Sequence, residues 1–416
     1  MKKLITSFLI IIAVQCIIAQ GVKKQILPAI NFREGVGLNF IRPDMNRAGY
    51  YGFMNDWEWI LDQYNALGVK WNRIAFSWVV IQPEKDVFDW TVYDKIVEKC
   101  FRDGIHILAT FGGHFDSPPV PAWAGQTLKN VINTNPEYLE NFITKWVERY
   151  KDKIDYWEIL NEPKVFHKGL TVLEYVEKIL KPSYKIVKKI DPGSKVLPCA
   201  YNNLPIIGNK EDFWYAARGY YDIQNYHLYS FWGYLRFSSD AGPEIEEMQN
   251  FRNLMIKHGE KNMEYWITET GWFGTSGIVG SINYYYKTVP NIYALEEMLQ
   301  EYDKSHLHED LTLKPNYTGE EIMKHSVTLR EDSLCAFWMK NFYPRILSLD
   351  GCTKVFQWVV MDEFKDGYKP EAHYGQKVRG DTVQVNQVSI WAIIGGDKKW
   401  RKSAYSLKEI VNQQSK

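Results

Sequence analysis

The sequence has no excess of charge of either sign. Its 416 residues include 50 lysines and arginines against 50 aspartates and glutamates, so the formal net charge is zero with histidine neutral. A chain without a basic stripe or a polybasic tail lacks the electrostatic attraction that draws proteins to nucleic acid or to anionic membranes. We therefore expect no nucleic acid partner, and the sequence leaves the oligomeric state open.

Cysteine is scarce, and neither cysteine nor histidine is arranged as a metal site. Five cysteines are present, at Cys16, Cys100, Cys199, Cys335 and Cys352, and their spacing matches no zinc pattern. Cys335 and Cys352 could form a disulfide or remain two core thiols, and the sequence leaves both open. The nine histidines are scattered along the chain. We expect no metal and no cofactor.

Only one stretch is apolar enough to concern a membrane, and it lies at the N-terminus. Lys2 and Lys3 precede the mostly apolar residues 4–18, and Ala19 offers a cleavage point. This stretch is too short to span a bilayer comfortably and has the pattern of a signal peptide. We expect a signal peptide over 1–19, a single catalytic domain over 20–416, no membrane span, and export to the periplasm, the outer surface or the medium.

A lipoprotein is the alternative interpretation of this segment. Cys16 would then be lipidated after cleavage, but it follows Gln15, where a small residue is usual. The mature chain is exported under either interpretation.

Eight short, mostly apolar runs predict buried strands, and helical patterns separate them. The runs are Val36–Phe40, Trp71–Trp78, Ile105–Phe111, Ile154–Leu160, Lys195–Ala200, Asp222–Leu228, Met263–Thr268 and Thr353–Val359. No glycine-rich phosphate loop follows the first run, which disfavours a nucleotide-binding open sheet. The count of eight favours the α/β class in the form of a (β/α)8 TIM barrel, with long loops after strands 7 and 8.

Amphipathic periodicity predicts the principal helices. They are Thr91–Asp103, Pro136–Tyr150, Thr171–Lys189, Pro243–His258, Ser326–Leu347 and Ser403–Val411. Asp56 and Thr171 are the expected helix N-caps. The chain is also rich in aromatic residues, with 16 Trp, 27 Tyr and 20 Phe. Core packing and a cleft that stacks sugar rings would each account for them, and composition does not separate the two.

Two strands end in a glutamate. The fourth runs through Trp-Glu-Ile-Leu-Asn-Glu-Pro over 157–163, and the seventh through Thr-Glu-Thr-Gly-Trp over 268–272. In a barrel, residues at the carboxyl ends of the strands meet on one face, so Glu162 and Glu269 should face each other there. Cleavage of a glycosidic bond with retention needs one protonated carboxyl beside the leaving oxygen and one carboxylate beneath the anomeric carbon.

These motifs together resemble clan A of the glycoside hydrolases, closest in appearance to families 39 and 5. The resemblance implies that Glu162 is the general acid/base and Glu269 the nucleophile. It also assigns substrate-binding or supporting roles to five further residues, which are Arg73, Asn161, His227, Tyr229 and Trp358. His114, which follows two glycines after the third strand, is a further candidate for the site, with a core histidine as the alternative. Asn161 matches the asparagine that holds the sugar 2-hydroxyl, and Arg73 the arginine that keeps the nucleophile ionised.

The expected function is a retaining, endo-acting hydrolase of β-glycosidic bonds, with a carbohydrate substrate. An exo-acting β-glycosidase and an inactive sugar-binding barrel are the alternatives. Glu158 lies four residues before Glu162 on the same strand face, one layer deeper in the barrel. We interpret it as a buried, paired structural acid rather than a catalyst.

Overall fold

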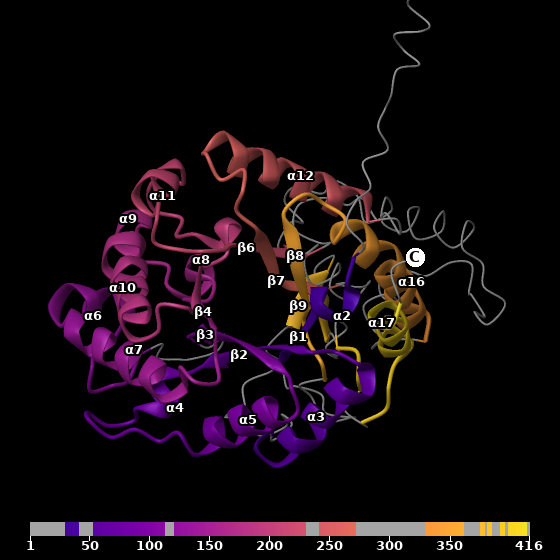
Figure 1. Ribbon diagram of the computed structural model, residues 1–416, viewed down its shortest axis with the longest axis horizontal. Coiled ribbons are helices and arrows are strands. Elements are labelled where there is room, and N and C mark those ends of the chain that lie inside the picture. The colour runs from indigo at the N-terminus through magenta and orange to yellow at the C-terminus, as the bar shows by residue number, and fades with distance from the viewer. Residues whose placement is uncertain are drawn as a thin grey trace, which may run out of the picture.

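The protein is a parallel barrel surrounded by helices (Figure 1). The computed structural model describes residues 30–40, 53–112, 120–229, 241–271, 329–361, 375–378, 381–384, 392–395 and 398–413. Its eight barrel strands are β1 Val36–Phe40, β2 Trp71–Phe76, β3 His106–Phe111, β4 Tyr156–Ile159, β5 Lys195–Pro198, β6 Gln224–Tyr229, β7 Tyr265–Gly271 and β8 Cys352–Gln357. The (β/α)8 fold expected from the sequence is therefore confirmed.

The strands pair in the order β5-β4-β3-β2-β1-β8-β7-β6, and every pairing is parallel. The ring is nearly closed between β5 and β6. There the backbone N–H of Asp222 donates to the carbonyl of Val196 at 2.8 Å, and the Asn225 side chain donates to the carbonyl of Pro198 at 3.0 Å. With the ring drawn together in this way, the carboxyl ends of all eight strands lie on one face.

The helices form the outer ring. They are α2 Phe32–Gly35, α3 Phe53–Leu67, α4 Trp78–Ile81, α5 Thr91–Arg102, α6 Leu128–Thr134, α7 Pro136–Tyr150, α8 Pro163–Phe166, α9 Val172–Tyr175, α10 Lys181–Ile190, α11 Glu211–Ala216, α12 Gly242–Lys257, α16 Leu329–Ile346 and α17 Lys402–Val411. None of these described helices combines the length and apolar character that crossing a membrane requires.

The predicted helix over 136–150 has the bounds expected, with Leu139, Phe142, Ile143, Trp146, Val147 and Tyr150 buried along its inner side. Thr171 is confirmed as an N-cap, in a capping box with Glu174. Asp56 is not an N-cap, because α3 begins at Phe53 and places Asp56 in its first turn. A negative charge is also favourable there, since the amino end of a helix is the positive end of its dipole.

The helix expected over 171–189 forms three consecutive parts. A π-helical segment, Val176–Leu180, lies between α9 and α10. Pro182 follows it in the first turn of α10. Because proline has no backbone N–H, the regular α-helical ladder is interrupted at this point.

The fourth strand is shorter than the apolar run that predicted it. β4 ends at Ile159, and both Leu160 and Glu162 have positive φ angles, of 76° and 38°. Left-handed backbone cannot continue a strand, so the chain turns sharply and α8 begins at Pro163. This turn places Glu162 at the lip of the barrel rather than on its wall.

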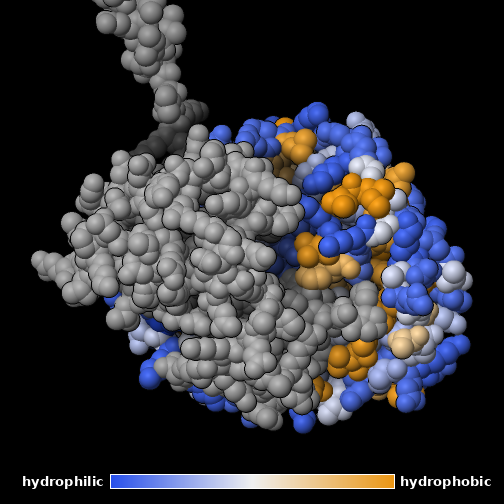
Figure 2. All heavy atoms as spheres, turned by 180° about the vertical axis from the view of Figure 1, so that it is seen from behind, coloured by the Kyte–Doolittle hydropathy of each residue, from blue (hydrophilic) through white to orange (hydrophobic). Residues whose placement is uncertain are grey.

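Aromatic side chains fill much of the described core. Six tryptophans are almost fully buried, at Trp78, Trp146, Trp157, Trp214, Trp266 and Trp338. Inside the barrel, Trp71 packs edge-on against Trp266 and Tyr156, with ring centroids 5.3 and 5.1 Å apart. Core packing thus accounts for a large part of the aromatic content. On the face seen in Figure 2, apolar residues form separate patches among hydrophilic ones.

Cys100, Cys199, Cys335 and Cys352 are buried and none of them forms a disulfide, so Cys335 and Cys352 do not bond to each other. The expected signal peptide and Cys16 lie outside the described residues, and export stays a prediction. Most of the two long loops also lies outside them. Within the predicted loop after strand 8, β9 Gly375–Val378 and β10 Asp381–Gln384 form an antiparallel pair.

Candidate active site

Glu162 and Glu269 meet at the carboxyl ends of β4 and β7. One carboxylate oxygen of each lies within 4.8 Å of the other and of a ring nitrogen of His227. Glu269 is buried, whereas the Glu162 side chain keeps 15% of its surface exposed. The two carboxyl groups therefore share one small site but differ in their access to solvent.

Glu269 is held chiefly by Arg73 and Tyr229, and His227 Nδ1 lies 3.5 Å from its Oε2. Arg73 donates from Nη1 to Glu269 Oε1 at 2.7 Å, and Tyr229 donates its hydroxyl to Glu269 Oε2 at 2.8 Å. Both contacts favour the ionised carboxylate over the protonated one. Burial, reinforced by the Glu269 charge, raises the pKa of Tyr229 well above its ordinary value, so its hydroxyl remains a donor.

Arg73 is buried, and all three nitrogens of its guanidinium donate hydrogen bonds. Besides Glu269 it donates to Glu158 twice, at 2.5 and 2.9 Å, to Asn39 at 2.9 Å and to Asn161 at 2.8 Å. Burial disfavours the charged form, but the Glu158 and Glu269 carboxylates outweigh it and raise the pKa of Arg73. Because Arg73 holds the Asn161 side-chain oxygen, the amide nitrogen of Asn161 is turned away from the guanidinium.

Glu162 is held by a histidine and an asparagine. His227 Nδ1 lies 2.7 Å from Glu162 Oε1, and Asn203 donates from Nδ2 to the same oxygen at 2.8 Å. Burial disfavours the charged imidazole. The carboxylates of Glu269, Glu158 and Glu162 outweigh that effect and raise the pKa of His227 to about 9. At neutral pH the ring is therefore a cation that donates to Glu162.

Glu158 lies one layer below, fully buried, as the sequence predicted for a paired structural acid. It accepts hydrogen bonds from Arg73, from Thr110 at 2.8 Å and from Asn225 at 2.9 Å. Burial favours the neutral carboxyl, but Arg73 and the hydrogen bonds lower the pKa of Glu158 to about 2. Glu158 is thus the ionised partner that holds Arg73 beneath the site.

We expect Glu158→Gln to lower the free energy of unfolding by about 3–5 kcal/mol at neutral pH, because it breaks a buried ion pair. Urea denaturation measures this, and Glu148→Gln on α7, whose side chain is 49% exposed, is the matched control. The folded pKa of Glu158 is depressed, so its contribution is present above pH 4.5 and is lost as the pH falls through about 2. The difference between variant and wild type should shrink over that interval; a constant difference would contradict the ion-pair interpretation.

The structure brings together six of the eight residues chosen from the sequence. Arg73, Asn161, Glu162, His227, Tyr229 and Glu269 form one network of contacts. Trp358 follows β8 at the same end of the barrel, where its backbone N–H donates to the carbonyl of Thr270 at 2.7 Å. His114 lies outside the described residues.

Sequence reasoning missed the polar residues that support this network. Asn39 lies inside the apolar strand β1 and Asn225 inside β6, and both are buried. A buried polar residue in a strand is a usable signal, because it must find a partner. Asn202 and Asn203 lie in a short 3-10 helix after β5, Tyr201–Asn203, whose sequence carries no comparable signal.

Glu162, His227 and Glu269 could by geometry hold a metal ion. Their charges fit poorly with one, however. The Arg73 guanidinium is already 2.7 Å from Glu269, and the pKa of about 9 keeps a proton on His227 that a metal ligand must lose. The arrangement suits proton transfer and attack by a carboxylate better than metal binding.

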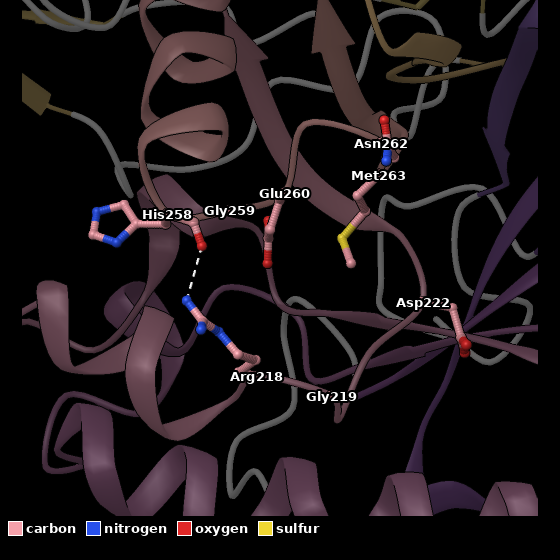
Figure 3. A pocket seen from close by; sticks show the side chains of 8 residues that line it. All are labelled: Arg218, Gly219, Asp222, His258, Gly259, Glu260, Asn262 and Met263. Carbon is pink, nitrogen blue, oxygen red and sulfur yellow. Dashed lines mark hydrogen bonds between the residues drawn. The ribbon is translucent and has the colours of Figure 1, made fainter.

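A separate hollow of about 470 Å³ lies at the opposite end of the barrel, by the starts of β6 and β7 (Figure 3). Its wall consists of Arg218, Gly219, Asp222, His258, Gly259, Glu260, Asn262 and Met263. Arg218 reaches across one side and donates to the carbonyl of His258 at 2.9 Å (Figure 3). None of the residues chosen from the sequence lines this hollow.

Comparison with known proteins places the fold. The family model for glycoside hydrolase family 42, described as beta-galactosidase, matches residues 52–137. Among solved structures, a family 39 glycoside hydrolase from the gut symbiont Bacteroides cellulosilyticus WH2 is 14% identical with a TM-score of 0.53. That match covers 92% of this chain and 65% of the other, so this chain spans about two thirds of that protein's length.

Two further structures are similar over most of both chains. A GH5_18 protein from Streptomyces cattleya, in complex with GlcNAc, is 13% identical with a TM-score of 0.57, over 92% of this chain and 80% of that one. A GH10 endoxylanase from a sugarcane soil metagenome is 13% identical with a TM-score of 0.53, over 91% and 97%. At these identities the likeness concerns the fold alone.

Proposed function

We propose that this chain, whose barrel is that of the clan A glycoside hydrolases, is a retaining hydrolase that cleaves β-glycosidic bonds within a polysaccharide or oligosaccharide. The observation that carries the proposal is the pairing of Glu162 with Glu269. One oxygen of each lies within 4.8 Å of the other. Retaining glycosidases place their carboxyl groups about 5–5.5 Å apart, whereas inverting ones need about 6.5–9.5 Å for a water molecule, so two carboxyl oxygens this close favour the shorter spacing between the groups.

The contacts of Glu269 suit its proposed role as nucleophile, and Glu162 takes the role of acid and then base. Glu269, ionised beside Arg73 and Tyr229, attacks the anomeric carbon and forms an ester with the sugar. As the bond to the leaving oxygen breaks, that oxygen takes the proton of Glu162. Water then attacks the anomeric carbon, the ester bond breaks, and Glu162 accepts the proton of the water. Glu269 is thereby restored as a carboxylate.

An inactive sugar-binding barrel would not need this arrangement. Both carboxyl groups are present, and each has partners that hold it in place. A binding site gains nothing from a buried carboxylate neutralised by a buried arginine, since burying both charges costs free energy. The arrangement supports catalysis.

Endo action remains the proposed mode, with exo action as its alternative. The fold does not separate them, because the barrel is shared by enzymes of many specificities and loop shape sets the cleft. The aromatic residues do not separate them either, because many of those in the described part of the chain lie in the core. Product sizing on long substrates will decide the mode.

A panel of β-glucans, xylans, mannans and marine polysaccharides tests the proposal. Proton NMR of the first product should show the β-anomer before mutarotation, and sizing should show internal cuts. An α-anomer would rule out retention, and single sugars released from chain ends would replace endo by exo action. No release of reducing ends from any substrate would overturn the proposed function.

A further inference from the structure

Asn203 contacts the proposed acid/base directly. Its side chain is 9% exposed, and Nδ2 donates to Glu162 Oε1 at 2.8 Å. The same nitrogen lies 3.3 Å from His227 Nδ1. Since an asparagine amide carries two N–H groups, it can serve Glu162 and still lie beside the ring. Asn203 belongs to the loop after β5, whereas Glu162 follows β4 and Glu269 lies near the end of β7.

The neighbouring Asn202 holds that loop in place. Its Nδ2 donates to the carbonyl of His227 at 2.7 Å, and its Oδ1 accepts from the backbone N–H of His227 at 3.1 Å. These two bonds imitate the pairing of a strand and fasten the loop to β6 next to an irregularity between Tyr226 and His227. Because Asn202 fixes the backbone of this loop, the neighbouring side-chain amide of Asn203 is held beside Glu162.

Both donors reach the same oxygen of Glu162. Oε1 is approached by Asn203 and by His227, while Oε2 has no hydrogen-bond partner among the residues described. An oxygen that accepts two N–H donors cannot also carry a proton without a clash of hydrogens. In the protonated acid, the proton must then be on Oε2.

We propose that Asn203 is a positioning residue that, together with His227, keeps Oε1 of Glu162 as an acceptor and so assigns the transferred proton to Oε2. This inference rests on the proposed function. Asn203 does not touch the reacting atoms and acts through Glu162. It also supports the carboxylate that the second step needs, because a neutral N–H donor favours the ionised form of its partner.

Asn203 gives Glu162 a hydrogen bond that does not depend on protonation, whereas the hydrogen bond from His227 does. The positive charge of His227 depends on nearby carboxylates, and Glu269 contributes most to raising the pKa of His227. When Glu269 becomes an ester, that support is lost. An amide does not titrate, so the Asn203 bond persists through both steps. Among the described residues, the other titratable groups that interact with Glu162 are Tyr229 and Cys199, and burial raises the pKa of each.

The test compares Asn203→Ala with Asn209→Ala, the same change at an exposed position of the same loop. We expect Asn203→Ala to lower kcat on a natural β-glycoside about 10- to 100-fold, the effect of one hydrogen bond to a charged group. The basic limb of kcat/KM should move to higher pH, because the protonated acid persists when a donor to its carboxylate is lost. Asn209→Ala should match the wild type in both.

A double-mutant comparison separates this role from a structural one. In a Glu162→Ala background, assayed with an aryl glycoside whose leaving group needs no proton, Asn203→Ala should change the rate less than about twofold. A loss as large as in the wild-type background, or an unmoved basic limb, would overturn the proposal. Equal melting temperatures of the single variants show that the comparison concerns folded protein.

A second readout does not depend on activity. In protein labelled with ¹³C at the glutamate carboxyl carbons, Glu162→Gln identifies the Glu162 signal, which should titrate at higher pH in Asn203→Ala than in the wild type. A shifted titration in a chain inactive on every glycoside would uphold the Asn203 inference and reject the proposed function. An unshifted titration in an active enzyme would uphold the proposed function and reject the Asn203 inference.

Discussion

Glu269→Ala should remove hydrolysis almost completely, with a loss in kcat on the order of 10⁴-fold or more, because no ester to the sugar can form without the nucleophile. Added azide can enter the space that the carboxylate leaves and attack from that side. One displacement of a β-glycoside from this face inverts the anomeric carbon. The product, identified by NMR, should be the α-glycosyl azide.

The matched control is Glu264→Ala. Glu264 precedes the first residue of β7, at the opposite end of the barrel from Glu269, and its carboxylate contacts Trp266 and Thr353. The same substitution there should leave kcat within about twofold of the wild type, because surface changes away from a site have small effects. Substantial hydrolysis by Glu269→Ala on natural substrate would show that another group is the nucleophile.

Glu162→Ala should fail at a different step. On natural substrate kcat should fall on the order of 10³-fold, since general acid catalysis contributes about 10²–10⁴-fold. With an aryl glycoside that has a good leaving group, the ester to Glu269 should still form, because that group needs no proton. Hydrolysis of the ester should then stall for want of a base. Intact-protein mass spectrometry should detect the glycosylated enzyme.

Azide distinguishes this variant from Glu269→Ala by the anomer formed. In Glu162→Ala, azide attacks the ester from the face where Glu162 stood, so two inversions yield the β-glycosyl azide and restore turnover. If both variants gave the same anomer, or if Glu162→Ala kept full activity on natural substrate, the assignment of roles would be wrong.

Local sequence signals were sufficient for the scaffold. The apolar runs and the helical spacing of 136–150 predicted elements that the structure contains, because burial on one face imposes periodicity on neighbouring residues. A carboxylate at the end of a strand was also readable, since the carboxyl ends of parallel strands share one face of a barrel. Glu158 could be distinguished from the proposed catalyst Glu162 because it lies one layer deeper in the barrel.

The tertiary structure decided how these residues share partners. Arg73 lies between Glu158 and Glu269 and donates hydrogen bonds to both. The residues around it on β2 give no sign of these two partners. Asn203 reaches Glu162 from another loop, where no periodicity marks it. Chain segments far apart in sequence meet only when the barrel closes.

The sequence by itself determined the fold class, because short-range patterns of burial mark the strands and helices. It predicted the two glutamates from their places at strand ends and from the resemblance of their flanking residues to clan A. Only the tertiary structure decided which oxygen of Glu162 is held and that Cys335 and Cys352 do not pair. It also decided that many of the aromatic residues pack in the core. Hydrogen bonds and packing depend on distances of a few ångströms between separate segments, and those distances exist only in the folded chain.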